Sequence, residues 1–472
     1  MSDLYGNNFN MNNTKILEED EKKKRIIIIG GVAVIGVIVI MIIVVAIISS
    51  INNQKNNLYI DGVGTKLNTS ILYIDGNNVP YVCVEKIAPK LTYQFFYGEY
   101  GTGSEDKSHC YVKNQYEIVL LEMDSNIIYK SLTKDESSTF DTYKMSYSVK
   151  RINDMLYISL PTMQKVFNVK YSYDADKNTL AINTLPALYQ KYNAAVKADN
   201  YQEMSNDFSN QKALIEDMIV VVTKDRQMGV ISTKDKSNII GPKYQKLTYS
   251  EGMGEFIAEQ NNKYGILVRN TEGDVSVKVG FSYDSLKLID NNIGLYLVEN
   301  SKKYGILDKN GRILINLEYD KIGIQNQKLF PTDNIKNSYI LHNYCIPAKQ
   351  GEYWTMFNIN GENFKNHDIY CFGSVFSTSQ TSQNVLLIQK NEEIEGIVAG
   401  KKNYSNKIKY GILDLNGNWV IPPSYDSIYK TISGGKTEYN MLFGNTIMSL
   451  GDSLKDIVSQ GATSNTGIIQ ID

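Results

Sequence analysis

The chain has 472 residues, with 51 acidic and 49 basic side chains, a net charge of −2 and 42% hydrophobic residues. The length allows two or three domains, and the lack of a basic surplus argues against a nucleic-acid-binding protein. Tyrosine is abundant, with 34 residues against 2 tryptophans, and the many Val and Ile runs add to the preference for β structure.

Near the N-terminus, residues 26–48 form an uncharged apolar run, IIIIGGVAVIGVIVIMIIVVAII. A helix of this length would extend about 34 Å, enough to cross a hydrocarbon core of roughly 30 Å. Near Ser49 and Ser50 the small-x-small pattern of a signal-peptide cleavage site is missing, because Ile47 and Ile48 occupy the upstream positions. We therefore expect an uncleaved signal anchor, so that the chain crosses the membrane once.

The charges beside this run predict its orientation. Two basic residues follow it over a similar length, Lys55 and Lys66, but five precede it: Lys15, Lys22, Lys23, Lys24 and Arg25. Because Lys and Arg stay on the cytoplasmic side, residues 1–25 should form a disordered cytoplasmic tail. Residues 49–57 would be a linker, and the domains that follow would lie outside the cytoplasm, in the cell envelope.

Two similar stretches, at 81–91 and 157–167, occur in a first domain at residues 58–185. Each has a short apolar strand that leads into residues at helical spacing: Val84, Ile87, Ala88 and Leu91 in the first, and Leu160, Met163 and Phe167 in the second. After the second stretch, 169–174 and 179–183 are predicted to form a hairpin around a polar turn. The pattern predicts a duplicated strand–helix–hairpin unit of the α+β class.

This unit resembles the copper amine oxidase N-terminal-like domain, in which a motif with Val-Pro-Leu-Arg and Val-x-Trp-Asp repeats in two lobes. Tyr173 stands where the family has Trp, and the Pro-Leu-Arg positions carry Cys83-Val84-Glu85 and Ser159-Leu160-Pro161. The resemblance implies a non-catalytic accessory module without copper. In agreement, His109 is the one histidine between residues 58 and 185.

Residues 186–217 are predicted to be a short helical linker that packs between domains. Pro186 suits a first helical turn, and Leu188, Tyr192 and Ala195 share one face of the expected helix. A second helical stretch is expected to contain Met204, Phe208 and Leu214.

An internal repeat occupies residues 218–450. Tyr-Gly-Ile recurs from Tyr264, Tyr304 and Tyr410; Met228-Gly-Val230 is a variant, and Tyr353-Trp-Thr355 is a degenerate copy. The recurring glycines are Gly229, Gly265, Gly305 and Gly411, and we expect close backbone approach at them. Each clear copy continues to a tyrosine, Tyr244, Tyr283, Tyr319 or Tyr425, and three of these precede Asp284, Asp320 and Asp426. Between the two motifs, Asn310-Gly311 and Asn416-Gly417 fit two-residue hairpin turns with positive φ at both residues.

This unit resembles the WG repeat, a bacterial β repeat of the form Trp-Gly-x-Ile-Asp followed by Val-Ile-Pro-x-Tyr-Asp. Met or Tyr replaces the Trp, and 420–426 is the best match to the second half. We expect five repeats, at 226–249, 262–288, 302–324, 351–374 and 408–430, with insertions at 325–350 and 375–407. The resemblance implies an interaction module and carries over no catalytic residues.

The overall fold class expected is therefore mainly β, with an array that is either propeller-like or made of stacked hairpins. A single unit cannot bury its own face, so neighbours must stack and the ends must be covered. At the start, residues 218–222 would form a strand that covers the first unit. At the end, residues 439–443 and 467–472 would complete the array, and the second of these two segments lies in a tail at 451–472.

The sequence contains no Walker loop, G-x-S-x-G or H-E-x-x-H motif, and His342 and His367 are isolated. We expect no cofactor, no metal and no catalysis. Cysteine pairs 83–110 and 345–371 remain an alternative to four free thiols, which the size of the domains favours.

The interpretation favoured by these patterns is a membrane-anchored, extracytoplasmic, non-enzymatic protein that binds a protein or a cell-wall glycan through its repeat surface. Two alternatives stay open: an envelope hydrolase or glycan-processing enzyme with an unrecognised site, and a passive structural spacer.

Overall fold

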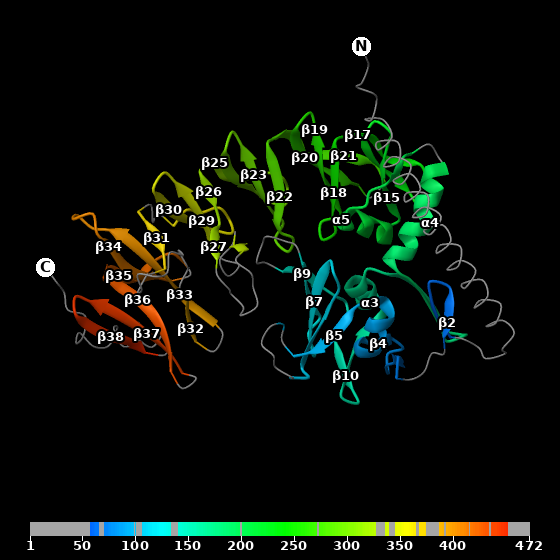
Figure 1. Cartoon of the computed structure of the whole chain (residues 1–472), viewed down its shortest axis with the longest axis horizontal. Coiled ribbons are helices and arrows are strands. Elements are labelled where there is room, and N and C mark those ends of the chain that lie inside the picture. The colour runs from blue at the N-terminus through cyan, green and yellow to red at the C-terminus, as the bar shows by residue number, and fades with distance from the viewer. Residues whose placement is uncertain are drawn as a thin grey trace, which may run out of the picture.

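The computed structural model describes residues 57–65, 70–98, 100, 106–133, 140–198, 201–270, 273–326, 336–338, 345–364, 368–373, 387–390, 393–414, 416–433 and 436–451. They are mainly β, as the sequence predicts, and form a body of sheets and short helices beneath a long arc of sheets (Figure 1). The predicted anchor at 26–48 lies outside these residues. Within them, no helix combines the length and the apolar character needed to span a membrane.

The lower body is built around a duplicated hairpin and helix. One sheet has the order β10-β11-β4-β3, with β3 (Leu72–Ile74), β4 (Pro80–Cys83), β10 (Lys150–Ile152) and β11 (Met155–Ser159). At its centre, Tyr81 pairs with Ser159 and Cys83 with Tyr157. Tyr81 and Tyr157 occupy the same position in their copies. Each of them therefore faces the residue two positions beyond the equivalent tyrosine of the other copy.

A helix follows each central strand, as the apolar spacing predicts. The first copy has α2 (Val84–Ile87) and the 3-10 turn η1 (Ala88–Leu91), and the second has α3 (Leu160–Phe167). All seven predicted core residues of these helices are buried. The first helix tightens to 3-10 geometry at Pro89, which has no N–H to donate.

Two further sheets complete the lower body. The predicted hairpin at 169–183 forms in the sheet β12-β13-β1-β2, made of β1 (Leu58–Ile60), β2 (Val63–Thr65), β12 (Lys170–Asp174) and β13 (Thr179–Asn183). A five-stranded meander lies between the two copies in the chain: β5 (Gln94–Tyr97), β6 (His109–Lys113), β7 (Glu117–Glu122), β8 (Ile127–Leu132) and β9 (Asp141–Lys144). The sequence analysis did not predict this meander.

The linking segment covers the first sheet of the arc. It contains α4 (Leu185–Ala198), β14 (Glu203–Met204), α5 (Phe208–Lys212) and η2 (Ala213–Glu216). Leu188 and Leu214 pack in one cluster with Ile219 and Ile231 of the arc. Met204 corrects the sequence analysis, because it lies in a strand that pairs with Val221 and not in a helix. The segment therefore acts as a cap on the array as well as a connector.

Six sheets follow one another along the arc. The first three are four-stranded: β14 with β15 (Met218–Val222), β16 (Met228–Ser232) and β17 (Asn238–Tyr244); β18 (Lys246–Ser250), β19 (Glu255–Gln260), β20 (Lys263–Arg269) and β21 (Val275–Tyr283); and β22 (Ser285–Asp290), β23 (Leu295–Asn300), β24 (Lys303–Leu307) and β25 (Ile313–Tyr319). Neighbouring sheets bury their faces together; Ile266 and Val279 of the second sheet, for example, pack with Tyr296 and Leu307 of the third.

The last three sheets are less regular. The fourth has β26 (Lys321–Ile322), β29 (Cys345–Gln350) and β30 (Tyr353–Asn358), beside the pair β27 (Ile324–Asn326) and β28 (Lys336–Ser338). The fifth has β31 (Cys371–Phe372), β32 (Leu387–Lys390), β33 (Glu393–Lys402), β34 (Ile408–Leu413) and β35 (Trp419–Tyr425). The sixth has β36 (Ser427–Ser433), β37 (Lys436–Phe443) and β38 (Thr446–Gly451). The insertions expected at 325–350 and 375–407 are thus partly wrong, because β29 and β33 are regular second strands.

In the part of the chain that the structure describes, the six sheets form an open arc and do not close into a ring (Figure 1). The first sheet lies against the linking segment, and the sixth lies at the far end, away from it. Residues 218–222 form β15 and 439–443 belong to β37, so both predicted strands take part in the end sheets. Residues 467–472 lie outside the described residues.

Candidate functional site

The recurring glycines lie on the third strand of their sheets, pressed against the fourth. A Cβ added to Gly229, Gly265 or Gly305 would lie 2.7, 2.5 or 2.7 Å from the carbonyl oxygen of Ile240, Val279 or Ile315. Gly411 approaches the carbonyl oxygen of Ile421 in the same way. Because backbone occupies the place of a side chain, no residue larger than glycine fits without a shift.

A bulge in the fourth strand causes this contact. Tyr304 pairs with Tyr319 and Ile306 with Ile315, so a step of two residues along β24 corresponds to four along β25. Irregular registers recur between the same positions in the first, second and fifth sheets. A tyrosine recurs at the end of these fourth strands and faces the residue before the glycine. The pairs are Tyr244 with Met228, Tyr283 with Tyr264, Tyr319 with Tyr304 and Tyr425 with Tyr410.

Each aspartate after these tyrosines joins two neighbouring sheets. One carboxylate oxygen of Asp284, Asp320 and Asp426 pairs with the lysine just before Tyr-Gly in the same sheet: Lys263, Lys303 and Lys409. The other oxygen accepts a backbone N–H in the turn between the second and third strands of the next sheet, from Ser301 at 2.7 Å, Gly351 at 2.7 Å and Gly444 at 2.8 Å. We name this arrangement the Lys–Asp joint.

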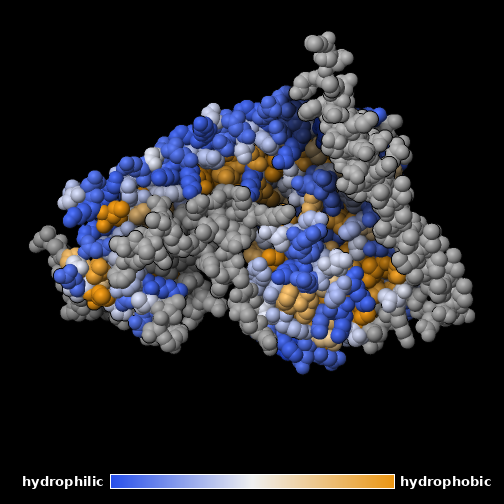
Figure 2. Space-filling model, in the orientation of Figure 1, coloured by the Kyte–Doolittle hydropathy of each residue, from blue (hydrophilic) through white to orange (hydrophobic). Residues whose placement is uncertain are grey.

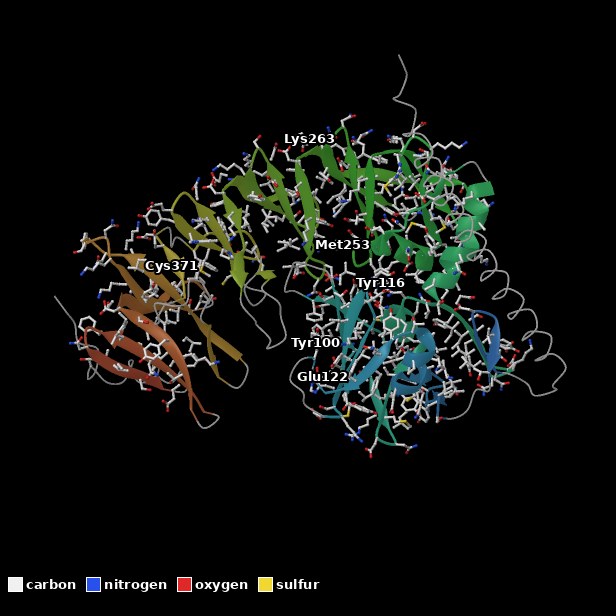
Figure 3. All side chains as sticks on the ribbon, viewed as in Figure 1. Tyr100, Tyr116, Glu122, Met253, Lys263 and Cys371 are labelled. Carbon is white, nitrogen blue, oxygen red and sulfur yellow. The ribbon has the colours of Figure 1, made fainter. Side chains whose placement is uncertain are left out.

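The joints lie on a polar margin of the arc. Figure 3 places Lys263 on the margin that points away from the lower body, and Figure 2 shows that this margin is largely hydrophilic. The hydrogen-bonded lysine is the largest influence on each aspartate and lowers its carboxyl pKa. The sequence analysis singled out the aspartates and missed the lysines, although the recurring Lys-Tyr-Gly-Ile at 263–266 and 303–306 was a visible signal.

Two sheets replace the joint with uncharged groups. In the first, Gln245 takes the place of aspartate, and its side-chain oxygen accepts the Asn262 N–H at 3.0 Å. In the fourth, Tyr353 and Tyr370 stand at the lysine and aspartate positions, with ring centroids 6.4 Å apart. The strand register shows that the predicted fourth repeat is wrong by one residue. Lys349 faces Trp354 in the same way that Glu299 faces Tyr304 in the third sheet. Trp354 therefore occupies the position of the motif tyrosine, and Thr355 occupies the position of the glycine.

The predicted two-residue turns are wrong in type. Gly311 and Gly417 have positive φ, at 79° and 82°, whereas Asn310 and Asn416 do not. Asp308 instead accepts the backbone N–H groups of Asn310 and Arg312 at 2.8 and 2.9 Å, which closes a longer turn. Gly311 also touches the preceding sheet, because a Cβ there would lie 2.6 Å from a methyl carbon of Val279. Turns with both residues at positive φ occur elsewhere, at Asn261-Asn262 and Ser301-Lys302.

The four cysteines all lie among the described residues, and none forms a disulfide. The half-buried His109 of β6 lies between carboxylates, with Nδ1 3.1 Å from Asp106 and Nε2 3.6 Å from Glu122. No group of three or more His, Cys, Asp or Glu side chains suited to a metal ion occurs in the part of the chain that the structure describes.

A buried ionic cluster joins the lower body to the arc. It contains Glu117 of β7, Lys130 of β8, Lys165 of α3, Lys212 of α5 and Glu251 after β18. Lys212 Nζ lies 2.9 Å from Glu117 and 3.0 Å from Glu251, and Lys165 Nζ lies 2.9 Å from Glu251. Lys130 Nζ lies 3.6 and 3.5 Å from the same two carboxylates. Glu117, Lys130 and Lys212 are 0%, 3% and 8% exposed, so these charges depend on one another for stabilisation.

Neutral groups add hydrogen bonds to the cluster. The Tyr93 hydroxyl donates to Glu117 at 2.7 Å, and Lys130 donates to the Asn168 side-chain oxygen at 2.9 Å. Asn168 ends α3 with φ 48°, a conformation that asparagine tolerates better than most residues. No pattern in the sequence predicts this cluster, because its members come from separate segments with no common motif.

The pKa shifts follow from burial and the opposite charges. Burial alone would raise the pKa of the Glu117 and Glu251 carboxyls, but Lys130 and Lys212 outweigh it and lower both. Burial alone would lower the pKa of Lys212, but the carboxylates of Glu117 and Glu251 raise it above its ordinary value. For Lys130, burial prevails and the pKa is lowered.

Beside this cluster lies an interdomain cleft of about 790 Å³. The start of β5 and the β6–β7 turn form one wall, the first turns of α4 form another, and Asn168, Phe208 and Gln211 lie between them. Tyr116 stacks on Phe208 with ring centroids 4.5 Å apart and an interplanar angle of 10°, so the lower body and the linking segment meet at an aromatic contact. Figure 3 shows Tyr116 at the edge of the lower body that faces the arc.

Residues 304–325 and 410–437 match the family model described as WG containing repeat. These two segments of the chain are therefore similar to WG β repeats. Each matched segment starts at the motif tyrosine on a third strand and continues through Tyr-Asp into the first strand of the next sheet. The sequence repeat thus spans two sheets, which is why the motif shows where sheets join and does not mark their second strands.

Among curated proteins, none matches this chain. Similar solved structures are the WD40 β-propeller domain of Doa1 (9% identity, 71% of this chain, 89% of that chain, TM-score 0.18), Hsv2 of Kluyveromyces lactis (8%, 67%, 87%, 0.22) and the β-propeller domain of the trilobed protease of Pyrococcus furiosus, with an open velcro topology (10%, 49%, 76%, 0.18). Because these TM-scores are low, the arrangement of sheets described above is based on strand pairing within this chain.

Proposed function

We propose that this protein is a non-enzymatic binding protein of the cell envelope, anchored by residues 26–48, with the lower body and the WG arc outside the cytoplasm. The observation that carries the proposal is the interdomain junction. There a buried ionic cluster fixes two modules to each other while a cleft of about 790 Å³ stays open beside it. A cleft of this size falls in the usual range of ligand sites.

The repeat array supports the same function. Lys–Asp joints and turn glycines connect successive sheets, so the arc presents a long surface of fixed shape. Repeat arrays of stacked units use such extended surfaces for binding. The lower body fits the accessory role implied by its resemblance to the copper amine oxidase N-terminal-like domain, since its two copies are related across β4 and β11.

Site-specific photo-cross-linking in intact cells tests this proposal. A photoreactive residue would replace Gln115, which is exposed at the cleft, in the full anchored chain. The matched control would replace Gln202, which is exposed but does not line the cleft. We expect an adduct with an envelope component from position 115 and none from position 202. A passive spacer would give no adduct from either position, and that result would contradict the proposal.

A further inference from the structure

The interdomain cleft has a nearly uncharged lining. Lys113 is the only charged residue among the described residues that line it. The Nζ atom of Lys113 lies 5.0 Å from the ring centroid of Phe96, a residue that does not line the cleft. The charges of the ionic cluster are buried and paired with one another. A charged ligand would lose water here without gaining an opposite charge, which is costly. The lining therefore favours a neutral ligand.

Carboxamide groups surround the mouth of the cleft. Gln94 at the start of β5, Gln115 in the β6–β7 turn and Gln190 on α4 are all exposed and line the cleft from three directions. None of the three side chains forms a hydrogen bond with another described residue. Each carboxamide offers two donors and one acceptor, which matches a ligand rich in groups that both donate and accept, such as hydroxyls.

Aromatic rings provide the second kind of contact. Tyr116 is 45% exposed even though it stacks on Phe208, and Tyr189 of α4 lines the opposite wall. The aliphatic side chains of Leu91 and Leu185 in the lining are buried. Flat rings and free carboxamides together suit a ligand with apolar C–H faces and many hydroxyl or acetamido groups.

From this combination we infer that the cleft binds a neutral oligosaccharide, with the rings stacking on sugar faces and Gln94, Gln115 and Gln190 hydrogen-bonding their polar groups. This inference rests on the proposed binding function and names its ligand class. The Tyr116–Phe208 contact lies where the lower body meets the linking segment, so the ligand would contact both.

Calorimetric titration of the full chain in detergent micelles tests the inference. The probe is the neutral tetramer of N-acetylglucosamine; a uronic-acid tetramer and an uncharged peptide are the comparison ligands. We expect binding of the neutral sugar and not of the other two. Each of Gln94→Ala, Gln115→Ala and Gln190→Ala should weaken it about three- to tenfold, as expected for the loss of one neutral hydrogen bond. Gln202→Ala should leave it unchanged.

The possible results separate this inference from the proposed function. If neutral oligosaccharides fail to bind, or bind equally well after all three substitutions, the sugar assignment is wrong. If position 115 then still cross-links a protein in cells, the binding function stands with a different ligand. If position 115 gives no adduct either, both the assignment and the function fail. All four substituted glutamines are exposed, so loss of folding does not explain a selective effect.

Discussion

Gly305 of β24 lies directly against the carbonyl oxygen of Ile315 on β25, so close that a Cβ on the glycine would be 2.7 Å from that oxygen. The same relationship holds for the other three motif glycines. The glycine thus permits the bulge that turns the fourth strand toward its tyrosine and the Lys–Asp joint.

Replacing Gly305 by valine should therefore lower the free energy of unfolding by about 1–3 kcal/mol, the usual cost of overpacking. Thermal melts of the full chain, followed by circular dichroism, measure the change. Gly280→Val is the matched control, since Gly280 lies on β21 with no heavy atom within 4 Å of an added Cβ. If Gly305→Val melts like the parent while a binding property changes, the structural role assigned to this glycine is wrong.

Glu117→Gln should destabilise the junction between the lower body and the arc. The substitution leaves Glu251 as the one carboxylate that pairs with Lys130 and Lys212 among the described residues. Breaking a buried ion pair on one side costs about 3–5 kcal/mol. Denaturant unfolding of the full chain gives the free energy, and hydrogen exchange at β7, α5 and the β18–β19 turn shows where the loss occurs.

The control for this experiment is Glu122→Gln on the same strand. Its carboxylate is half exposed and pairs only loosely with His109, at 3.6 Å. Exposed pairs contribute little, so this variant should behave like the parent. Equal effects of the two substitutions would show that the buried cluster does not hold the modules together.

Much of the local structure follows from the sequence, and the long-range contacts do not. Apolar spacing predicts the helices at 84–91 and 160–167, and the recurrence of glycine in the motif predicts close backbone approach. The second strands of the sheets carry no motif, so the sequence predicts insertions where β29 and β33 lie. Glu117 and Lys212 are 95 positions apart in the chain, and no local pattern connects two charges that only the fold brings together.

The fourth sheet offers a test of the joint itself. Tyr353→Lys and Tyr370→Asp together would rebuild the Lys–Asp pair found between Lys303 and Asp320. In a double-mutant cycle on thermal stability, the double variant should be more stable than the sum of the single changes by about 0.3–1 kcal/mol, as for other exposed ion pairs. A coupling energy of zero or of opposite sign would mean that the joint does not transfer between sheets.

The C-terminal end of the arc should be essential for solubility. Deleting residues 436–472 removes β37 and β38 and exposes the buried side chains of Ile428 and Ile421 that pack with Tyr439 and Met441. We expect aggregation, because the deletion leaves an uncovered apolar face and an unpaired strand edge. Light scattering measures it, and deletion of 452–472 alone, which keeps the sixth sheet, is the control. A monomeric product from the longer deletion would contradict the capping role.

A membrane anchor at 26–48 should place both modules outside the cytoplasm. Protease added to intact cells that express the full chain, with one tag at each end, tests it most directly. We expect the C-terminal tag to disappear while the N-terminal tag stays attached to a short membrane-bound fragment. Persistence of the C-terminal tag until the cells are lysed, or release of a soluble form that starts near residue 50, would contradict it.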